Sequence, residues 1–211
     1  NEGHLDAFRE HPEFASFRGR LDLVRAPYLV DWTLEKAIYD AQVIPGVRRH
    51  VAPHGAEVAA LFAVLTRMRK AAADRYSRAL GPLAQDLTPL EKADLYATGA
   101  TPQRLTGEQA KELHAGVEAI YHEGDVYPLY EGRTGASPRE MRSVILDAAQ
   151  HPDYRCLSPF AVLDRIADLC TRKSEFEWLR METVAGGYHD PKAFLKALRD
   201  RLMESLEDEV R

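Results

Sequence analysis

Apolar residues recur at intervals of three and four along most of this chain, which is the spacing of one face of an α-helix. Capping and turn residues divide this pattern into segments, and several segments begin with Ser, Thr or Asp followed by Pro. The predicted helices begin near Thr33, Pro53, Thr88, Thr106, Ser137, Ser158 and Asp190. The sequence therefore predicts a mainly α protein.

One short segment departs from the helical pattern. Leu21–Ala26, read LDLVRA, is a short apolar run that ends at Pro27, which is typical of a β-strand. One strand cannot form a stable sheet alone. Because the chain also begins abruptly at Asn1, we expect the partner strands to come from a longer parent protein or from another chain.

The most specific local motif is GRTGASPREMR at Gly132–Arg142. Ser137 occupies the N-cap position of a helix, Pro138 its first position, and Glu140 completes a capping box. Arg139 is thereby held in the first turn, where the helix dipole is positive and acidic residues are preferred. Two adjacent positive features indicate an anion-binding site, and the simpler alternative is a solvated arginine.

Composition excludes several classes of protein. The 211 residues include 28 Lys and Arg against 33 Asp and Glu, and this net charge of -5 argues against nucleic-acid binding. No apolar run is long enough to cross a membrane. Cys156 and Cys170 lack metal-ligand spacing, which favours free thiols and a cytoplasmic location. Pro53 separates His50 from His54, so we expect no metal site there.

The motifs of common nucleotide enzymes and hydrolases are missing from the sequence. It contains no GxxxxGK[ST], no GxGxxG in a strand–helix unit, no protein-kinase signature set, no HExxH and no GxSxG. A complete enzyme is therefore not expected within these residues. Arg67, Arg69 and Lys70 form a basic cluster, which we interpret as a solvated face, with an anion contact as the alternative.

Several segments, taken in order, carry a family resemblance. They are Asn1-Glu2, Phe8, FRGRLDLVRAPY at Phe17–Tyr28, KAIY at Lys36–Tyr39, APH at Ala52–His54 and FAVLTRMR at Phe62–Arg69. Together they resemble the later half of the ATPase module of PrkA-type serine protein kinases, which are bacterial AAA+ proteins. The GASPRE stretch is similar to the start of an AAA+ lid helix, where an arginine reaches the nucleotide.

The resemblance implies roles for three residues. Arg139 would contact phosphate from the lid, at the position called sensor 2. Asn1 would occupy the sensor-1 position, which orients the attacking water or senses the γ-phosphate. Arg20 would be a catalytic arginine finger that reaches the nucleotide of a neighbouring subunit, a role worth ~10³–10⁵ in rate in phosphoryl transfer.

The resemblance also implies a domain organisation. Residues 1–30 would end the AAA+ nucleotide-binding core, residues 31–150 would form a helical lid with an insertion, and residues 151–211 would form a C-terminal helical extension. The expected fold is a lid-like helical bundle with one leftover β-strand from the nucleotide-binding sheet. ATP and Mg²⁺ would bind the parent protein, and none is expected to bind this part alone.

Three functions remain open at this point. The first is the C-terminal part of a PrkA-like AAA+ ATPase and serine protein kinase, inactive alone, with the ATPase core, neighbouring subunits and a protein substrate as partners. The second is a helical interaction or regulatory module without nucleotide chemistry. The third is a self-sufficient kinase that holds Mg²⁺ with Asp125 and Glu131 near Arg133 and Arg139.

Overall fold

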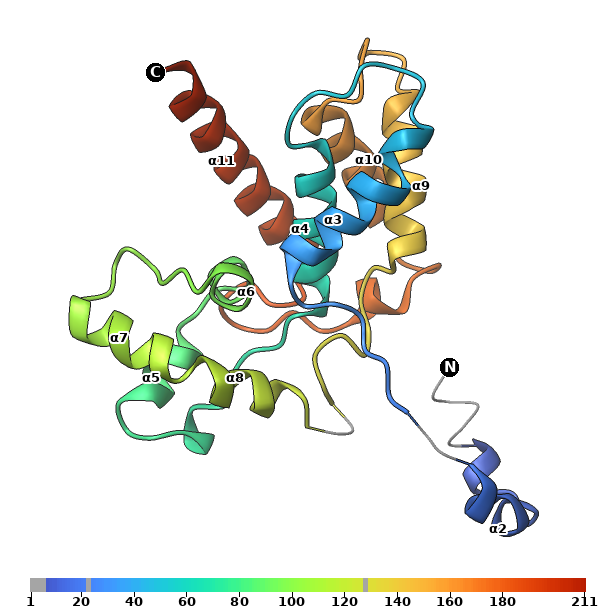
Figure 1. The fold of residues 1–211 in the computed structure, drawn as a ribbon, viewed down its shortest axis with the longest axis vertical. Helices are drawn as coiled ribbons and strands as arrows, with labels where there is room; N and C mark the ends of the chain where they lie inside the picture. Colours follow the sequence, from blue (N-terminus) through green and yellow to red (C-terminus); the bar gives the residue numbers. More distant parts are fainter. Residues whose placement is uncertain (1–6, 22–23, 127–128) are drawn as a thin grey trace.

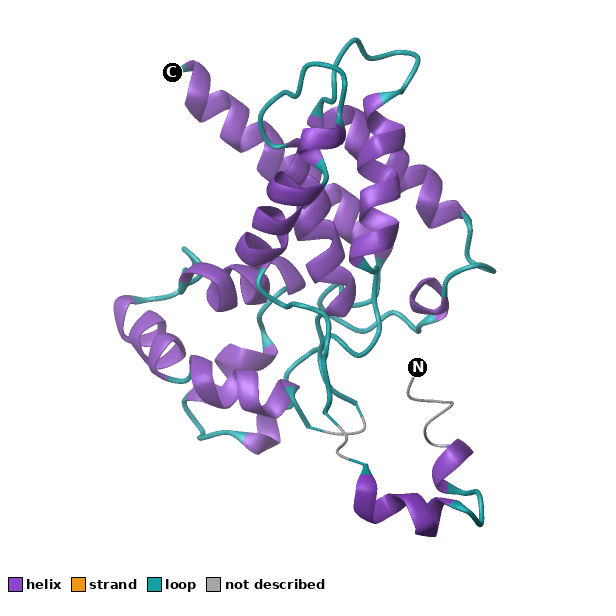
Figure 2. Ribbon diagram, turned by 45° about the vertical axis from the view of Figure 1, so that its right-hand side comes forward, coloured by secondary structure: helices purple, strands orange, loops and turns teal. Residues whose placement is uncertain are grey.

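The computed structural model describes residues 7–21, 24–126 and 129–211. Within these ranges the regular structure is helical, apart from two isolated β-bridges, so the predicted mainly α class is confirmed (Figure 2). The described helices are α2 (Phe14–Phe17), α3 (Trp32–Gln42), α4 (Gly55–Arg67), α5 (Leu80–Gln85), α6 (Pro89–Thr98), α7 (Gly107–Ala115), α8 (Val117–Gly124), α9 (Pro138–Ala149), α10 (Pro159–Thr171) and α11 (Pro191–Val210). Short 3₁₀ helices are η1 (Arg18–Arg20), η2 (Ile44–Gly46), η3 (Ala73–Arg75) and η4 (Glu177–Arg180).

Helix α4 is the centre of the main hydrophobic core. Every one of its residues except Glu57 is buried. A helix that is apolar on all sides must be enclosed by other elements. Helices α3, α9, α10 and α11 pack around it, and α11 then continues outward from the bundle (Figure 1). Among the described residues, none of these helices is long and apolar enough to cross a membrane.

Helices α5 to α8 form a smaller unit with its own core, inserted in the chain between α4 and α9 (Figure 1). The buried residues of this second core are Ala71, Leu80, Ala84, Leu87, Leu95, Leu113 and Ile120. Helix α6 contacts both α4 and α8, so it joins the smaller unit to the main bundle. The insertion therefore rests on the end of the central helix.

The predicted strand Leu21–Ala26 is not formed in the part of the chain that the structure describes. Leu21 and residues 24–26 have no regular secondary structure, and Asp22 and Leu23 lie outside the described residues. Val24 is 83% exposed. A strand needs a neighbour for its backbone N–H and C=O groups, and the described residues offer none at this place.

Capping interactions explain where most helices begin. The predicted capping boxes of Thr88 and Thr106 are both present. The prediction for α3 was wrong by two residues, because Asp31 rather than Thr33 is the N-cap. The Asp31 carboxylate accepts hydrogen bonds from the backbone N–H groups of Thr33 and Leu34, at 2.8 and 3.2 Å.

Candidate functional site

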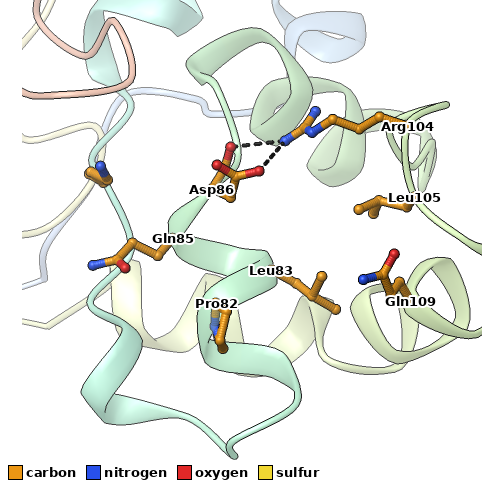
Figure 3. Close-up of a pocket in the computed structure, with 8 residues that line it drawn as sticks. Pro82, Leu83, Gln85, Asp86, Arg104, Leu105 and Gln109 are labelled. Carbon is orange, nitrogen blue, oxygen red and sulfur yellow. Dashed lines mark hydrogen bonds and ion pairs between the residues drawn. The ribbon is translucent and has the colours of Figure 1, made fainter.

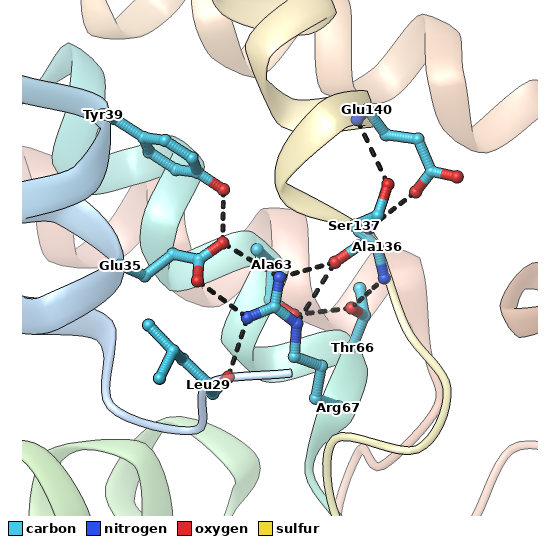
Figure 4. Close-up of polar contacts among 9 residues, drawn as sticks. All are labelled: Leu29, Glu35, Tyr39, Ala63, Thr66, Arg67, Ala136, Ser137 and Glu140. Atoms are coloured by element: carbon cyan, nitrogen blue, oxygen red, sulfur yellow. Dashed lines mark hydrogen bonds and ion pairs between the residues drawn. The ribbon is translucent and has the colours of Figure 1, made fainter. Parts of the chain in front are cut away.

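The start of α9 has the local geometry that the sequence predicts. The Ser137 hydroxyl accepts from the Glu140 backbone N–H, and the Glu140 carboxylate accepts from the Ser137 N–H at 2.7 Å (Figure 4). Pro138 follows at the first helical position. Arg139 is exposed, and its guanidinium makes no hydrogen bond or ion pair with any other described residue. Its charge therefore adds to the positive end of the helix dipole.

The loop directly before α9 is held by the last turn of α4. The Ala136 N–H donates to Oγ1 of Thr66 at 2.8 Å, and the Ala136 carbonyl accepts from Nε and Nη2 of Arg67 at 3.1 and 2.6 Å (Figure 4). Gly135 has φ +137°, and a Cβ there would lie 2.6 Å from Cγ of Arg67. Both backbone polar groups of the residue preceding the N-cap are thus fixed by α4.

Arg67 is a buried cation with every donor in use. The residue is 2% exposed, and its side chain is 0% exposed. A guanidinium has five N–H donors in a planar fork. Besides Ala136, they reach the two carboxylate oxygens of Glu35, at 2.9 and 3.0 Å, and the Leu29 carbonyl at 2.7 Å. The buried charge is therefore both paired and fully hydrogen-bonded, which is the condition under which such a pair is tolerated.

Tyr39 completes this arrangement on α3. Its hydroxyl donates to Oε1 of Glu35 at 2.6 Å (Figure 4). Burial raises the pKa of Tyr39 far above its ordinary value, and the neighbouring Glu35 carboxylate adds to the rise. Tyr39 therefore remains a proton donor. We call Leu29, Glu35, Tyr39, Thr66, Arg67 and Ala136 the Arg67 cluster.

The segment before α3 also meets the loop before α9. We call residues 24–30 the connector. The Tyr28 N–H donates to the Gly132 carbonyl at 2.9 Å, and the Arg67 guanidinium lies 5.0 Å from the centre of the Tyr28 ring. Gly132 has φ +75°, and a Cβ there would lie 2.3 Å from the Tyr28 carbonyl oxygen. The connector, α3, α4 and the start of α9 are therefore joined within one set of contacts.

A second buried cation, Lys92, lies near the Arg67 cluster, where the α5–α8 insertion joins the main bundle. Nζ of Lys92 on α6 donates to the Arg69 carbonyl and to Oε1 of Glu131, both at 2.7 Å. Glu131 also accepts from the Arg69 N–H at 2.7 Å and from the Tyr96 hydroxyl at 2.9 Å. Burial, followed by the Glu131 charge, raises the pKa of Tyr96 well above its ordinary value. We call Arg69, Lys92, Tyr96 and Glu131 the Lys92 cluster.

Of the residues assigned roles by resemblance, Arg20 and Arg139 are not brought together. Asn1 lies outside the described residues. Arg20 is the last residue of η1 and is exposed, and η1 lies with α2 apart from the bundle that contains Arg139 (Figure 1). The roles of all three residues stay predictions.

Two interpretations of the sequence are wrong. Arg67 was grouped with Arg69 and Lys70 as a solvated face, but it is buried because α4 is enclosed on every side. The carboxylates proposed for Mg²⁺ bind different cations instead. Asp125 accepts from Arg25 at 2.9 Å, and Glu131 belongs to the Lys92 cluster. In the described residues the two carboxylates are thus paired with Arg25 and Lys92 rather than grouped with each other.

An open hollow on the insertion does not offer a comparable site. It lies over α5 and the start of α7, and its lining includes Arg104, Asp86 and Gln109 (Figure 3). Arg104 binds the Asp86 carboxylate at 3.1 Å and also Glu91. Its charge is thus already compensated by two acids, in contrast to the charge of Arg139.

Comparison with known proteins identifies the family. Residues 1–74 match the PrkA AAA domain, and residues 90–211 match the PrkA serine protein kinase C-terminal domain. Because the second match covers more than half of the chain, the chain belongs to the PrkA family, as the resemblance indicated. Comparisons with curated proteins and with solved structures gave no match.

The two matched regions share one hydrophobic core. Helix α4 lies within the AAA match, whereas α9, α10 and α11, which pack on it, lie within the C-terminal match. The chain is therefore a PrkA-like AAA+ protein in which the end of the AAA region and the C-terminal domain are packed together. The division at residues 30 and 150 stays a prediction.

Proposed function

We propose that this chain is the lid and C-terminal helical part of a PrkA-family AAA+ ATPase and that Arg139 binds the phosphates of ATP. The observation that carries this proposal is an exposed arginine, without an ion-pair partner among the described residues, in the first turn of a capped helix whose preceding loop is fixed. A cation at a helix N-terminus is unfavourable until an anion binds there. The match to a PrkA AAA domain supports ATP as that anion in this proposal.

The other two residues take complementary roles in this proposal. Arg20, exposed at the end of η1, acts on ATP bound by a neighbouring subunit, and Asn1 orients the attacking water. The phosphate loop and the Mg²⁺ ligands come from residues other than these 211, since the sequence has no GxxxxGK[ST]. The partners are therefore the ATPase core, neighbouring subunits and a protein substrate in the cytoplasm.

The first test is Arg139→Ala in the ATPase that contains this chain. Loss of one charge-assisted hydrogen bond to phosphate weakens ATP binding roughly 10- to 100-fold, measured as KM and by titration with Mg-ATP. The melting temperature stays unchanged or rises slightly, because Arg139 has no ion-pair partner among the described residues and its charge opposes the helix dipole. The control is Arg142→Ala, which removes an exposed arginine one turn further along α9 and leaves ATP binding unchanged.

The same titration of the 211-residue chain alone gives no heat if the phosphate loop lies elsewhere. Tight binding by this chain would contradict that part of the proposal. An unchanged KM in Arg139→Ala would contradict the role of Arg139 and would leave the helical interaction module as the better interpretation.

A further inference from the structure

The Arg67 cluster joins three separate segments of the chain. The five donors of Arg67 end on the connector at Leu29, on α3 at Glu35 and on the loop before α9 at Ala136. Two of these acceptors are backbone carbonyls, so the bonds fix the path of the chain itself. Thr66 holds the N–H of the same Ala136.

The chemistry of the cluster demands an arginine at residue 67. A lysine ammonium has three donors around one point, and it cannot span two carboxylate oxygens and two carbonyls in one plane. The position is buried, so bulk solvent does not replace a lost donor. Any shift of the connector or of α3 therefore acts on Ala136 through the guanidinium. Because Arg139 lies three residues after Ala136, such a shift also changes the position of Arg139.

We propose that Arg67 is a positioning residue for Arg139, fixing the start of α9 relative to the connector and α3. The inference rests on the proposed function, because it assigns to Arg67 the placing of a phosphate-binding arginine. It adds a physical link between the segment that enters the lid and the residue that senses the nucleotide. Arg67 itself does not touch ATP.

The test compares variants of the ATPase that contains this chain. Arg67→Lys keeps the charge and loses the fork, and Thr66→Val keeps the shape and loses the bond to the Ala136 N–H. We expect both to raise the KM for ATP several-fold, up to the factor found for Arg139→Ala. Combined with Arg139→Ala, neither should raise the KM further, because both act through that one side chain. Hydrogen exchange at Ala136 and Glu140 should become faster.

Lys92→Met is the matched control for a purely structural role. It removes a buried cation that pairs with Glu131, at the other end of the loop from Ala136, so it lowers the melting temperature but should change the KM for ATP much less than Arg67→Lys does. If Arg67→Lys and Thr66→Val behave like this control while Arg139→Ala raises the KM, the positioning role is refuted and the proposed function stands. If Arg139→Ala leaves the KM unchanged, the proposed function fails and the positioning role fails with it.

Discussion

The Arg67 and Lys92 clusters are both built on a buried cation and a buried carboxylate, but they hold the loop before α9 at different points and join it to different elements. In both ion pairs the side chains are at most 5% exposed. Arg67 bonds to the carbonyls of Leu29 and Ala136, which belong to the connector and to the loop before α9. Lys92 bonds to one carbonyl, that of Arg69, just after α4.

This difference follows from the shapes of the two cations. The planar fork of arginine reaches several acceptors in fixed directions, whereas the ammonium of lysine is a compact point charge. The first cluster can therefore orient the start of α9, and the second mainly attaches the α5–α8 insertion to the bundle. Similar burial and similar pairing thus serve two different purposes in one chain.

The largest expected effect is on stability and comes from removing each cation. Arg67→Met and Lys92→Met each leave a carboxylate buried without its partner, which costs about 3–5 kcal/mol of unfolding free energy. Arg67→Met should cost more, because it also leaves the Leu29 and Ala136 carbonyls without these donors. Urea unfolding measures both values.

A matched pair of double variants checks the cause. Glu35→Gln together with Arg67→Met, and Glu131→Gln together with Lys92→Met, remove the uncompensated charge and should recover part of each loss. A smaller loss in Arg67→Met than in Lys92→Met would contradict the comparison.

A smaller effect is expected from the tyrosine of each cluster. Tyr39→Phe and Tyr96→Phe each remove one hydroxyl that donates to a buried carboxylate, which costs about 1.5–3 kcal/mol. Oε1 of Glu35 still accepts from Arg67, whereas Oε2 of Glu131 has no other donor among the described residues. Tyr96→Phe should therefore be the more destabilising of the two in urea unfolding, and the reverse order would show that the clusters are less different than their contacts indicate.

The sequence predicts the local parts of the site well. Ser137 and Glu140 lie three residues apart, and one helical turn brings such a pair together whatever surrounds it. The exposed position of Arg139 follows from the same turn. Leu21–Ala26, which overlaps the connector at residues 24–26, was expected to be a strand, but strand formation depends on partner strands that the described residues do not supply.

The Arg67 cluster was not predicted, because its members are far apart in sequence. Arg67 is 32 residues from Glu35 and 69 residues from Ala136. No local pattern joins them, and the three basic residues within positions 67–70 suggested a face exposed to solvent. One signal was present: apart from Glu57, the stretch GAEVAALFAVLT is apolar around nearly the whole helix, which favours burial of the arginine that follows.

The smallest expected effect is a pH dependence of the unfolding free energy, and it arises at His189, near Arg69 of the Lys92 cluster. His189 has φ +56°, its ring contacts the Glu182 carbonyl at 3.3 Å, and Arg69 is nearby. Burial lowers the pKa of His189, and the Arg69 charge lowers it further. The unfolded chain therefore binds more protons than the folded one below about pH 6.5, and stability falls as the pH drops through that value.

Asn tolerates positive φ, so His189→Asn should keep the fold and reduce the difference in unfolding free energy between about pH 8 and pH 5. Arg67→Lys should leave that difference as it is in the unaltered chain, and an equal difference in all three proteins would refute the assignment to His189.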